Sequence, residues 1–393
     1  MIVGCKKQDN TYRTSVEHPR WFGKAVMYEM NIADATPEGT FKAAEAVLDN
    51  LAELGIDAIR LNSIFPADSL GAVVKYKGVN PAYGEFEDFF SFVDYAHTKG
   101  IRVVIDWVSD CVSKESEIAK EHNDWIVADD CSSEVAFLNY ENTDVWADQS
   151  ANMIFFEARK IDGIWGCGLN SVPADFWNET ARIGREDRPQ MIFVTDGEIP
   201  ELQEKGSNAY LAISQIEQWE ALSAGKFDAD SLANFYVNFS KMPVGTLPVN
   251  FTAESLVEGC EDAQVAEKIM KQFAALSFVV PGVPLIAGGT RGMDTFYKDL
   301  INLRNKHASL WAYPLGGDMA VLPSDHRTEI FAFEREVEGD ICLAMFNFSD
   351  KEVEFNIANH VTTKDRKFLL PPHGFHIIFA VGDCFGDCDE IQE

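Results

Sequence analysis

Acidic side chains after two apolar runs are the residues of this chain best suited to acid–base chemistry. Asp106 and Asp110 mark the end of one run, and Asp196 and Glu198 follow another. Paired carboxyl groups can donate a proton to a breaking bond and activate the attacking group, provided that they face one another. Asp106 and Asp110 can line one pocket only if the strand breaks at Ser109. Together with Asp175, these residues predict an acidic mouth at one end of a sheet or barrel.

A cysteine lies where another reactive side chain would be expected. The run Ile161–Asn170 is short and apolar with small residues, which suits the end of a buried parallel strand, where barrel enzymes place their chemistry. Cys167 would be a nucleophile as a thiolate, but its run contains no Arg, Lys or His to lower its pKa. We therefore predict a buried, inert thiol. Trp107 and Trp165 either form platforms for a ligand or fill the pocket, and we favour filling.

The other cysteines indicate no metal centre. All eight are widely spread without paired CxxC spacing, so neither a zinc site nor a disulfide scaffold is predicted. Carboxylate oxygens at the mouth would suit Ca²⁺, but no D-x-D-x-D loop supports such a site. We expect no metal and no cofactor. Cys384 and Cys388 lie in an acidic tail, where a disulfide or ligand pair is the alternative to a frayed terminus.

Charge and hydropathy limit the partners and the location. Lys and Arg total 33 against 63 Asp and Glu, a net charge of −30, which argues against nucleic acid and anionic membranes. No apolar run of 18 residues occurs, so no transmembrane helix is predicted. The start resembles a lipoprotein cleavage box at Cys5, but the apolar stretch that should precede such a box is missing. The compartment stays open between a soluble, cytoplasmic protein and one lipid-anchored through Cys5.

Strand-like and helix-like segments alternate between residues 21 and 310, as in a parallel α/β fold. The predicted strands are Ala25–Ile32, Ala58–Phe65, Arg102–Val108, Gly163–Leu169, Met191–Thr195, Ala209–Ser214, Thr246–Phe251 and Val283–Ala287. Helical periodicity falls between several of them, in Thr40–Leu54, Phe86–Lys99 and Val265–Phe278. We predict a TIM (β/α)8 barrel, the economical way to close eight such units.

The remaining segments predict a second domain and two short ends. Short aromatic-rich runs with alternating polarity fill residues 311–381, which predicts an antiparallel β-sandwich. Turn residues, among them Glu338-Gly-Asp, separate these runs. Residues 1–20 are expected to be an N-terminal extension and residues 382–393 an acidic tail.

Several segments resemble the alpha-amylase family, glycoside hydrolase family 13, in the family's order along nearly the whole chain. They are Ala25–Met30, Leu54–Leu61, Tyr76–Gly84, His97–Val108, Leu138–Val145, Pro281–Ile286, Phe296–Arg304 and Phe346–Asp350. The resemblance implies a barrel with a C-terminal β-domain that cleaves α-glycosidic bonds with retention. That chemistry uses a nucleophile after strand four, a Glu acid/base after strand five and a third carboxylate after strand seven. The insert after strand three is expected to be reduced here.

The matching positions imply that most of this catalytic set is replaced. The nucleophile position is Cys167, and the acid/base aligns with Asp196, with Glu198 two residues on. The third carboxylate position is Thr252. In the third-strand pattern Asp106 is kept, whereas Asp110 replaces an Asn.

The resemblance also implies residues for binding a sugar. Trp165 stands at the position of the family's Arg, and Tyr83 and Asn250 lie in matching segments. With Asp106, Trp107 and Asp110 they form the predicted substrate-binding set.

We therefore expect a catalytically inactive relative, a pseudoenzyme of carbohydrate metabolism, that binds an α-glucan, an oligosaccharide or an unidentified protein partner. One alternative is a hydrolase with a non-standard carboxylate set, in which Asp196 or Glu198 is the acid and Asp106 is the second carboxylate. The other is a protein-binding scaffold similar to the ancillary heavy chain of amino-acid exchangers.

Overall fold

The computed structural model describes residues 13–127, 134–238, 242–252, 254–288, 293–357, 367–381 and 390–392. The lipid anchor predicted at Cys5 and the pair Cys384 and Cys388 lie outside these residues. In the described residues, Cys111, Cys167, Cys260 and Cys342 are free thiols. None of the described helices is both long enough and apolar enough to cross a membrane.

Eight strands form a closed barrel in the order β1, β2, β3, β6, β7, β8, β9 and β10. Their bounds are Met27–Met30, Ala58–Leu61, Arg102–Val108, Gly163–Cys167, Ile192–Thr195, Ala209–Leu211, Leu247–Thr252 and Val283–Ile286. Seven of these strands lie within predicted segments, and β9 extends one residue beyond its predicted segment Thr246–Phe251, so the predicted barrel is confirmed. Between β3 and β6 a small hairpin of β4 (Cys111–Ser113) and β5 (Val135–Phe137) is inserted.

The chain packs as two compact units. The N-terminal unit is Thr14–Pro19 with Val26–Leu211, and the C-terminal unit is Met1–Arg13, Arg20–Ala25 and Ala212–Glu393. The division falls between β8 and β9, so it does not follow the boundary predicted at residues 310 and 311, which stays a prediction.

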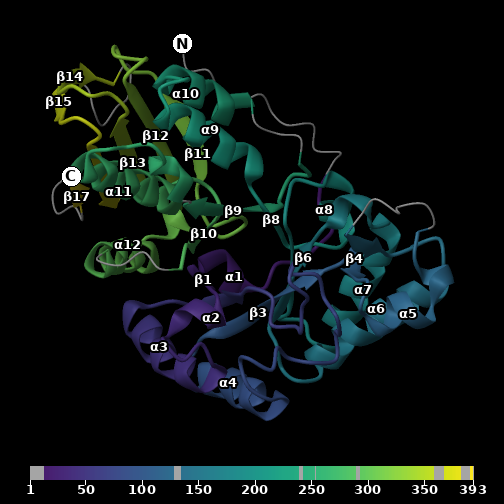
Figure 1. Cartoon of the computed structure of the whole chain (residues 1–393). Helices are drawn as coiled ribbons and strands as arrows, with labels where there is room; N and C mark the ends of the chain where they lie inside the picture. Colours follow the sequence, from purple (N-terminus) through teal and green to yellow (C-terminus); the bar gives the residue numbers. More distant parts are fainter. Residues whose placement is uncertain are drawn as a thin grey trace. The chain divides into compact units, whose positions relative to one another are not determined.

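Helices cover the strands of the N-terminal unit. They are α2 (Ile32–Ala35), α3 (Phe41–Leu54), α4 (Phe86–Thr98), α5 (Glu117–Glu121), η1 (Asn123–Trp125), α6 (Thr143–Glu157), η2 (Leu169–Ser171), α7 (Ala174–Asp187) and α8 (Pro200–Lys205). Helix α3 begins where the Thr40 hydroxyl accepts a hydrogen bond from the Ala43 amide (3.2 Å) and ends at Gly55 with φ 101°. Its apolar face packs beside α4 (Figure 1).

The C-terminal unit contains the predicted β-sandwich. One sheet has β11 (Asp318–Leu322), β12 (Ile330–Val337), β13 (Asp340–Asn347), β16 (Phe375–Val381) and β17 (Glu390–Gln392), and the other has β14 (Val353–Asn356) and β15 (Lys367–Leu370). Ile330, Met345, Phe355 and Phe368, from both sheets, share one apolar core. The helical elements of this unit are α1 (Arg20–Lys24), α9 (Ile213–Ser223), α10 (Ala229–Asn238), η3 (Glu254–Val257), α11 (Ala263–Val279), α12 (Asp294–Lys306) and η4 (Ala308–Leu310).

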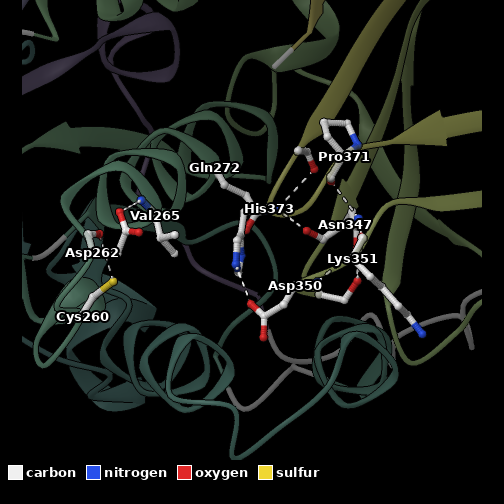
Figure 2. A network of polar contacts seen from close by, with 11 residues as sticks. Cys260, Asp262, Val265, Gln272, Asn347, Asp350, Lys351, Pro371 and His373 are labelled. Carbon is white, nitrogen blue, oxygen red and sulfur yellow. Dashed lines mark hydrogen bonds and ion pairs between the residues drawn. The ribbon is translucent and has the colours of Figure 1, made fainter.

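A buried amide network fixes the end of β13 in this unit (Figure 2). The Asn347 side-chain amide donates to the carbonyls of Lys351 and Pro371, both at 2.8 Å. Gln272 of α11 donates to the Asn347 carbonyl at 2.7 Å. Because these groups are buried, each needs such a partner, and the network sets how α11 packs on the sandwich.

Candidate active site

Three barrel strands of the N-terminal unit bring Arg60, Asp106 and Trp165 together. Asp106 of β3 is the register partner of Trp165 of β6, so both side chains leave the barrel wall on the same side. The Arg60 guanidinium, from β2, donates to both carboxylate oxygens of Asp106, at 2.8 and 3.0 Å. It also stacks on the fully buried Trp165 ring, 4.1 Å from the ring centroid.

Glu29 of β1 completes this polar cluster. One of its oxygens accepts a hydrogen bond from the Arg60 guanidinium at 3.2 Å. Burial raises the pKa of Glu29, although the nearby Arg60 opposes that change. For Arg60, burial alone would lower the pKa, but the Asp106 carboxylate more than compensates, so the guanidinium stays charged. The cluster is a buried, bidentate ion pair with a second acid beside it.

Cys167, the last residue of β6, is a thiol in an environment that disfavours the thiolate. Burial and the Asp106 carboxylate raise the pKa of Cys167 well above its ordinary value. The sequence indicated no cation near this cysteine, but Arg60 reaches it from β2 and partly opposes the rise. Burial is the larger effect, so the group is poorly suited to nucleophilic attack at neutral pH.

Asp110 and Asp196 both lie against Gly168, which has the left-handed φ of 72°. The Gly168 amide donates to one oxygen of Asp196 at 2.8 Å, and a Cβ on Gly168 would lie 2.3 Å from a carboxylate oxygen of Asp110. Burial raises the pKa of both Asp110 and Asp196. The second oxygen of Asp196 is buried without a hydrogen-bond partner among the described residues. The structure therefore places two acids, each with a raised pKa, beside one glycine.

The end of β3 separates Asp106, which lies within the strand, from Asp110, which follows it. Strand β3 ends at Val108, so the break at Ser109 that the acidic mouth requires is present. Tyr76 and Tyr140 fix this break by donating their hydroxyls to the carbonyls of Val108 and Ser109, both at 2.6 Å. Asp106 is held inside the strand by Arg60, whereas Asp110 lies beyond the break.

Trp107 and Trp165, for which filling was favoured over a platform role, are both completely buried. Trp107 is stacked on Tyr76 at a centroid distance of 4.7 Å, and its indole donates to Gln149 of α6 at 3.3 Å. Its ring therefore fills the layer between the strands and α6. Trp165 lies under Arg60. Tyr83 is half-buried, with its ring 6.0 Å from Phe41.

The remaining predicted residues divide between the two units. Glu198 is half-buried, and with burial its charge helps raise the pKa of Tyr210. Asn250 and Thr252 are buried in β9 of the C-terminal unit. The Asn250 amide donates to the Ser277 carbonyl and accepts from Gln215, both at 3.0 Å. These contacts already occupy the amide with protein partners.

Two members of the cluster, Arg60 and Glu29, are absent from the predicted site. A sequence feature that could have identified them is that each is a lone charged residue inside a short apolar strand. A charge at such a position needs a buried partner, which the sequence does not name. No group of three or more His, Cys, Asp or Glu in the described ranges is arranged to hold a metal ion.

Comparison with known proteins supports the family resemblance. Residues 18–163 match the family model described as the alpha-amylase catalytic domain. The trehalose synthase of Pimelobacter sp. is 30% identical over 162 residues, which cover 38% of this chain and 26% of that protein. Neopullulanase 2 of Thermoactinomyces vulgaris is 24% identical over 367 residues, which cover 76% of this chain and 61% of that protein. The chain thus spans less than two thirds of the length of these relatives.

Solved structures share the fold. A noncanonic maltogenic alpha-amylase from Thermotoga neapolitana has a TM-score of 0.75 and 17% sequence identity, over 92% of this chain and 97% of that one. The barrel with its C-terminal β-domain is therefore the architecture of alpha-amylases. The family model and the relatives together support a relationship between the catalytic-domain region of this chain and the alpha-amylase family.

Proposed function

We propose that this chain is a carbohydrate-binding relative of the alpha-amylases that does not hydrolyse α-glycosidic bonds by the retaining mechanism. The observation that supports it most directly is Cys167, a thiol with a raised pKa at the position of the family's nucleophile. Retention requires a nucleophilic carboxylate about 5–5.5 Å from the acid/base. Without that nucleophile no covalent glycosyl intermediate forms.

The Arg60 cluster supports the same proposal. Arg60 occupies both oxygens of Asp106 and one face of Trp165, so these groups already have protein partners. Arg60, Asp106 and Trp165 thus form a packed interior in which each group already has a protein partner. Asp110 and Asp196 remain as candidate acceptors for sugar hydroxyls, because both side chains are only half-buried and neither forms an ion pair with the described residues.

A second candidate is direct hydrolysis with inversion. Burial raises the pKa of Asp196, which is the direction of change that favours a general acid. Inversion also needs a carboxylate about 6.5–9.5 Å away to activate water. Asp110, on the other side of Gly168, and Asp106 are the residues to test for that role.

The test combines turnover with binding. The purified chain is incubated with maltooligosaccharides and aryl α-glucosides, and product release is measured beside the thermal midpoint with and without maltotriose. We expect a raised midpoint and no product. Release of product with inverted anomeric configuration, lost in Asp196→Asn, would instead establish the inverting hydrolase. No response in either measurement would contradict carbohydrate binding and favour a protein-binding scaffold.

A matched variant tests the role of position 167. Cys167→Asp restores a carboxylate there, and Cys167→Ser changes the thiol without adding an acid. Measurable aryl α-glucoside cleavage by Cys167→Asp alone is the result expected if the missing nucleophile is what prevents catalysis. Cleavage by the wild type or by Cys167→Ser would contradict it.

A further inference from the structure

A cleft of about 770 Å³ opens on the outer face of the N-terminal unit, built by α6, α7, α8 and the segment 15–17. These helices are neighbours in the fold (Figure 1). Its volume lies in the range of small-molecule sites. We infer that this cleft is a second saccharide-binding site, separate from the residues around Cys167; the choice of saccharide over other neutral ligands rests on the proposed function.

One polar face of α7 forms the floor of the cleft. Asp175, Asn178, Glu179, Arg182 and Arg185 recur every three or four residues, which places them on one side of the helix. The opposite side buries Phe176, Trp177, Ala181 and other small or apolar residues. The cleft is therefore backed by a rigid, well-packed helix.

The arginines of the floor are already occupied. Arg182 donates to both oxygens of Glu179, at 2.8 and 2.7 Å, and also pairs with Glu186. Arg185 donates to the carbonyls of Gly206 (2.6 Å) and Lys205 (3.1 Å). An anionic ligand would have to displace these acceptors. The occupied arginines thus argue against a phosphate or carboxylate ligand.

Other groups on the walls remain available. Neither Asp175 nor Glu17 forms a side-chain hydrogen bond or ion pair with the described residues, and the same holds for the Lys205 ammonium. The lining side chains carry three acids (Glu17, Asp175, Glu179) and three bases (Arg182, Arg185, Lys205), so the cleft has no net formal charge. Balanced charge with free donors and acceptors suits a neutral ligand that carries hydroxyl groups.

Trp146 of α6 supplies an apolar surface to the same cleft. Its indole donates to the Tyr140 carbonyl at 2.8 Å, and its ring meets the edge of Phe176 at 5.8 Å, so its orientation is fixed. The side chain is nevertheless only half-buried. A preset aromatic surface beside carboxylates matches a sugar ring, which has an apolar C–H face and a polar rim.

The wall opposite α7 is also ordered. The Ser15 amide and hydroxyl both donate to the Glu204 carbonyl, at 2.8 and 3.0 Å. Asn208 donates to the Glu17 carbonyl at 3.3 Å. Because the backbone on both sides of the cleft is held, little ordering entropy opposes binding.

Isothermal titration of maltotriose into the full chain tests this inference. We expect Asp175→Asn and Trp146→Ala each to raise the dissociation constant of one site about tenfold, since each removes a direct contact. Asp294→Asn is the matched control, because Asp294 is also an exposed Asp in the first turn of a helix, α12. Asp175 is exposed, so its variant keeps the test valid even if Trp146→Ala does not fold.

Asp110→Asn separates the two proposals. Binding lost in Asp110→Asn but unchanged in Asp175→Asn and Trp146→Ala would overturn the cleft site and leave the proposed function standing. The reverse pattern would support the cleft and count against a saccharide at the barrel residues. Binding of choline instead of maltotriose, abolished by Asp175→Asn, would overturn the inference in favour of an organic cation.

Discussion

Arg60 gives the buried acidic and aromatic side chains inside the barrel of the N-terminal unit a protein partner. It lies in the middle of β2, pairs with Asp106 and stacks on Trp165. A buried ion pair of this kind adds little stability by itself, but losing one partner leaves an uncompensated charge. Replacing either member of the pair alone should therefore destabilise the barrel interior.

Glu157 of α6 gives the molecule a predicted pH dependence. It is 5% exposed, and burial with the nearby Asp187 raises its pKa to about 7, despite Arg188. A folded pKa above the unfolded one means that the native state holds the proton more tightly. Its contribution to the free energy of unfolding is therefore present below about pH 4.5 and is lost as the pH rises to about 7.

Glu157→Gln should remove that loss. We expect the free energy of unfolding of the variant, relative to that of the wild type, to be about 2 kcal/mol higher at pH 8 than at pH 5. Urea denaturation at the two pH values measures this difference. Glu53→Gln, at an exposed position on α3, is the control. It should change the free energy of unfolding by the same amount at both pH values. If Glu157→Gln also changed the free energy of unfolding equally at both pH values, the raised pKa would be contradicted.

At the residue scale the sequence identifies candidate side chains better than it identifies the contacts that they make. Cys167, Asp110 and Asp196 were all identified from their places after apolar runs, and the last two do meet at one glycine. The Arg60–Asp106 pair was not, because pairing between strands depends on barrel register, which residue types alone do not give. Trp107 and Trp165 show the same limit, since each lies at a strand end but is enclosed by different neighbours.

At the scale of helices and strands, more of the structure can be predicted, because the sequence patterns that specify these elements are local. Each barrel strand is a short apolar run, and α3 has both a capping Thr40 and a terminating Gly55. The hairpin between β12 and β13 turns at Glu338 and Gly339, both with positive φ, as the Glu-Gly-Asp segment indicated. The observed strand ends differ from the predicted ones by up to a few residues, because pairing with neighbouring strands determines where each strand ends.

Strand β6 depends on a close approach by α7, which gives a prediction for this pair of elements. A Cβ on Gly166 would lie 2.4 Å from the Trp177 ring and 2.6 Å from Leu169. Trp177 cannot easily move, because its indole donates to the Ser207 hydroxyl at 2.7 Å and its ring contacts Phe193. Gly166→Ala should therefore lower the free energy of unfolding by about 2–3 kcal/mol, measured by urea denaturation.

Gly100→Ala provides the comparison. Gly100 has φ 78° and nothing within 4 Å of an added Cβ, so this variant reports backbone strain without a steric clash. We expect a loss of about 1 kcal/mol. A Gly166→Ala protein no less stable than Gly100→Ala would show that α7 and β6 adjust freely, contrary to the packing described.

At the scale of the whole molecule, the excess of 30 negative charges is the dominant electrostatic feature. Many of the cations already pair locally, as in Lys42–Glu45, Lys99–Asp49 and Arg327–Asp230. Exposed pairs of this type contribute little, so they do not cancel the repulsion among the remaining acids. Repulsion of like charges favours expanded states of the chain over compact ones.

Salt should therefore stabilise this protein at neutral pH. Raising NaCl from 10 to 150 mM shortens the screening length from about 30 Å to about 8 Å, which weakens long-range repulsion more than short ion pairs. We expect the thermal midpoint at pH 7.5 to rise by about 2 °C or more, measured by circular dichroism. Near pH 4.5, the isoelectric point expected from the sequence, the net charge is small and the rise should disappear. A midpoint that falls with salt at pH 7.5 would mean that local ion pairs, rather than the overall charge, determine the electrostatic stability of the fold.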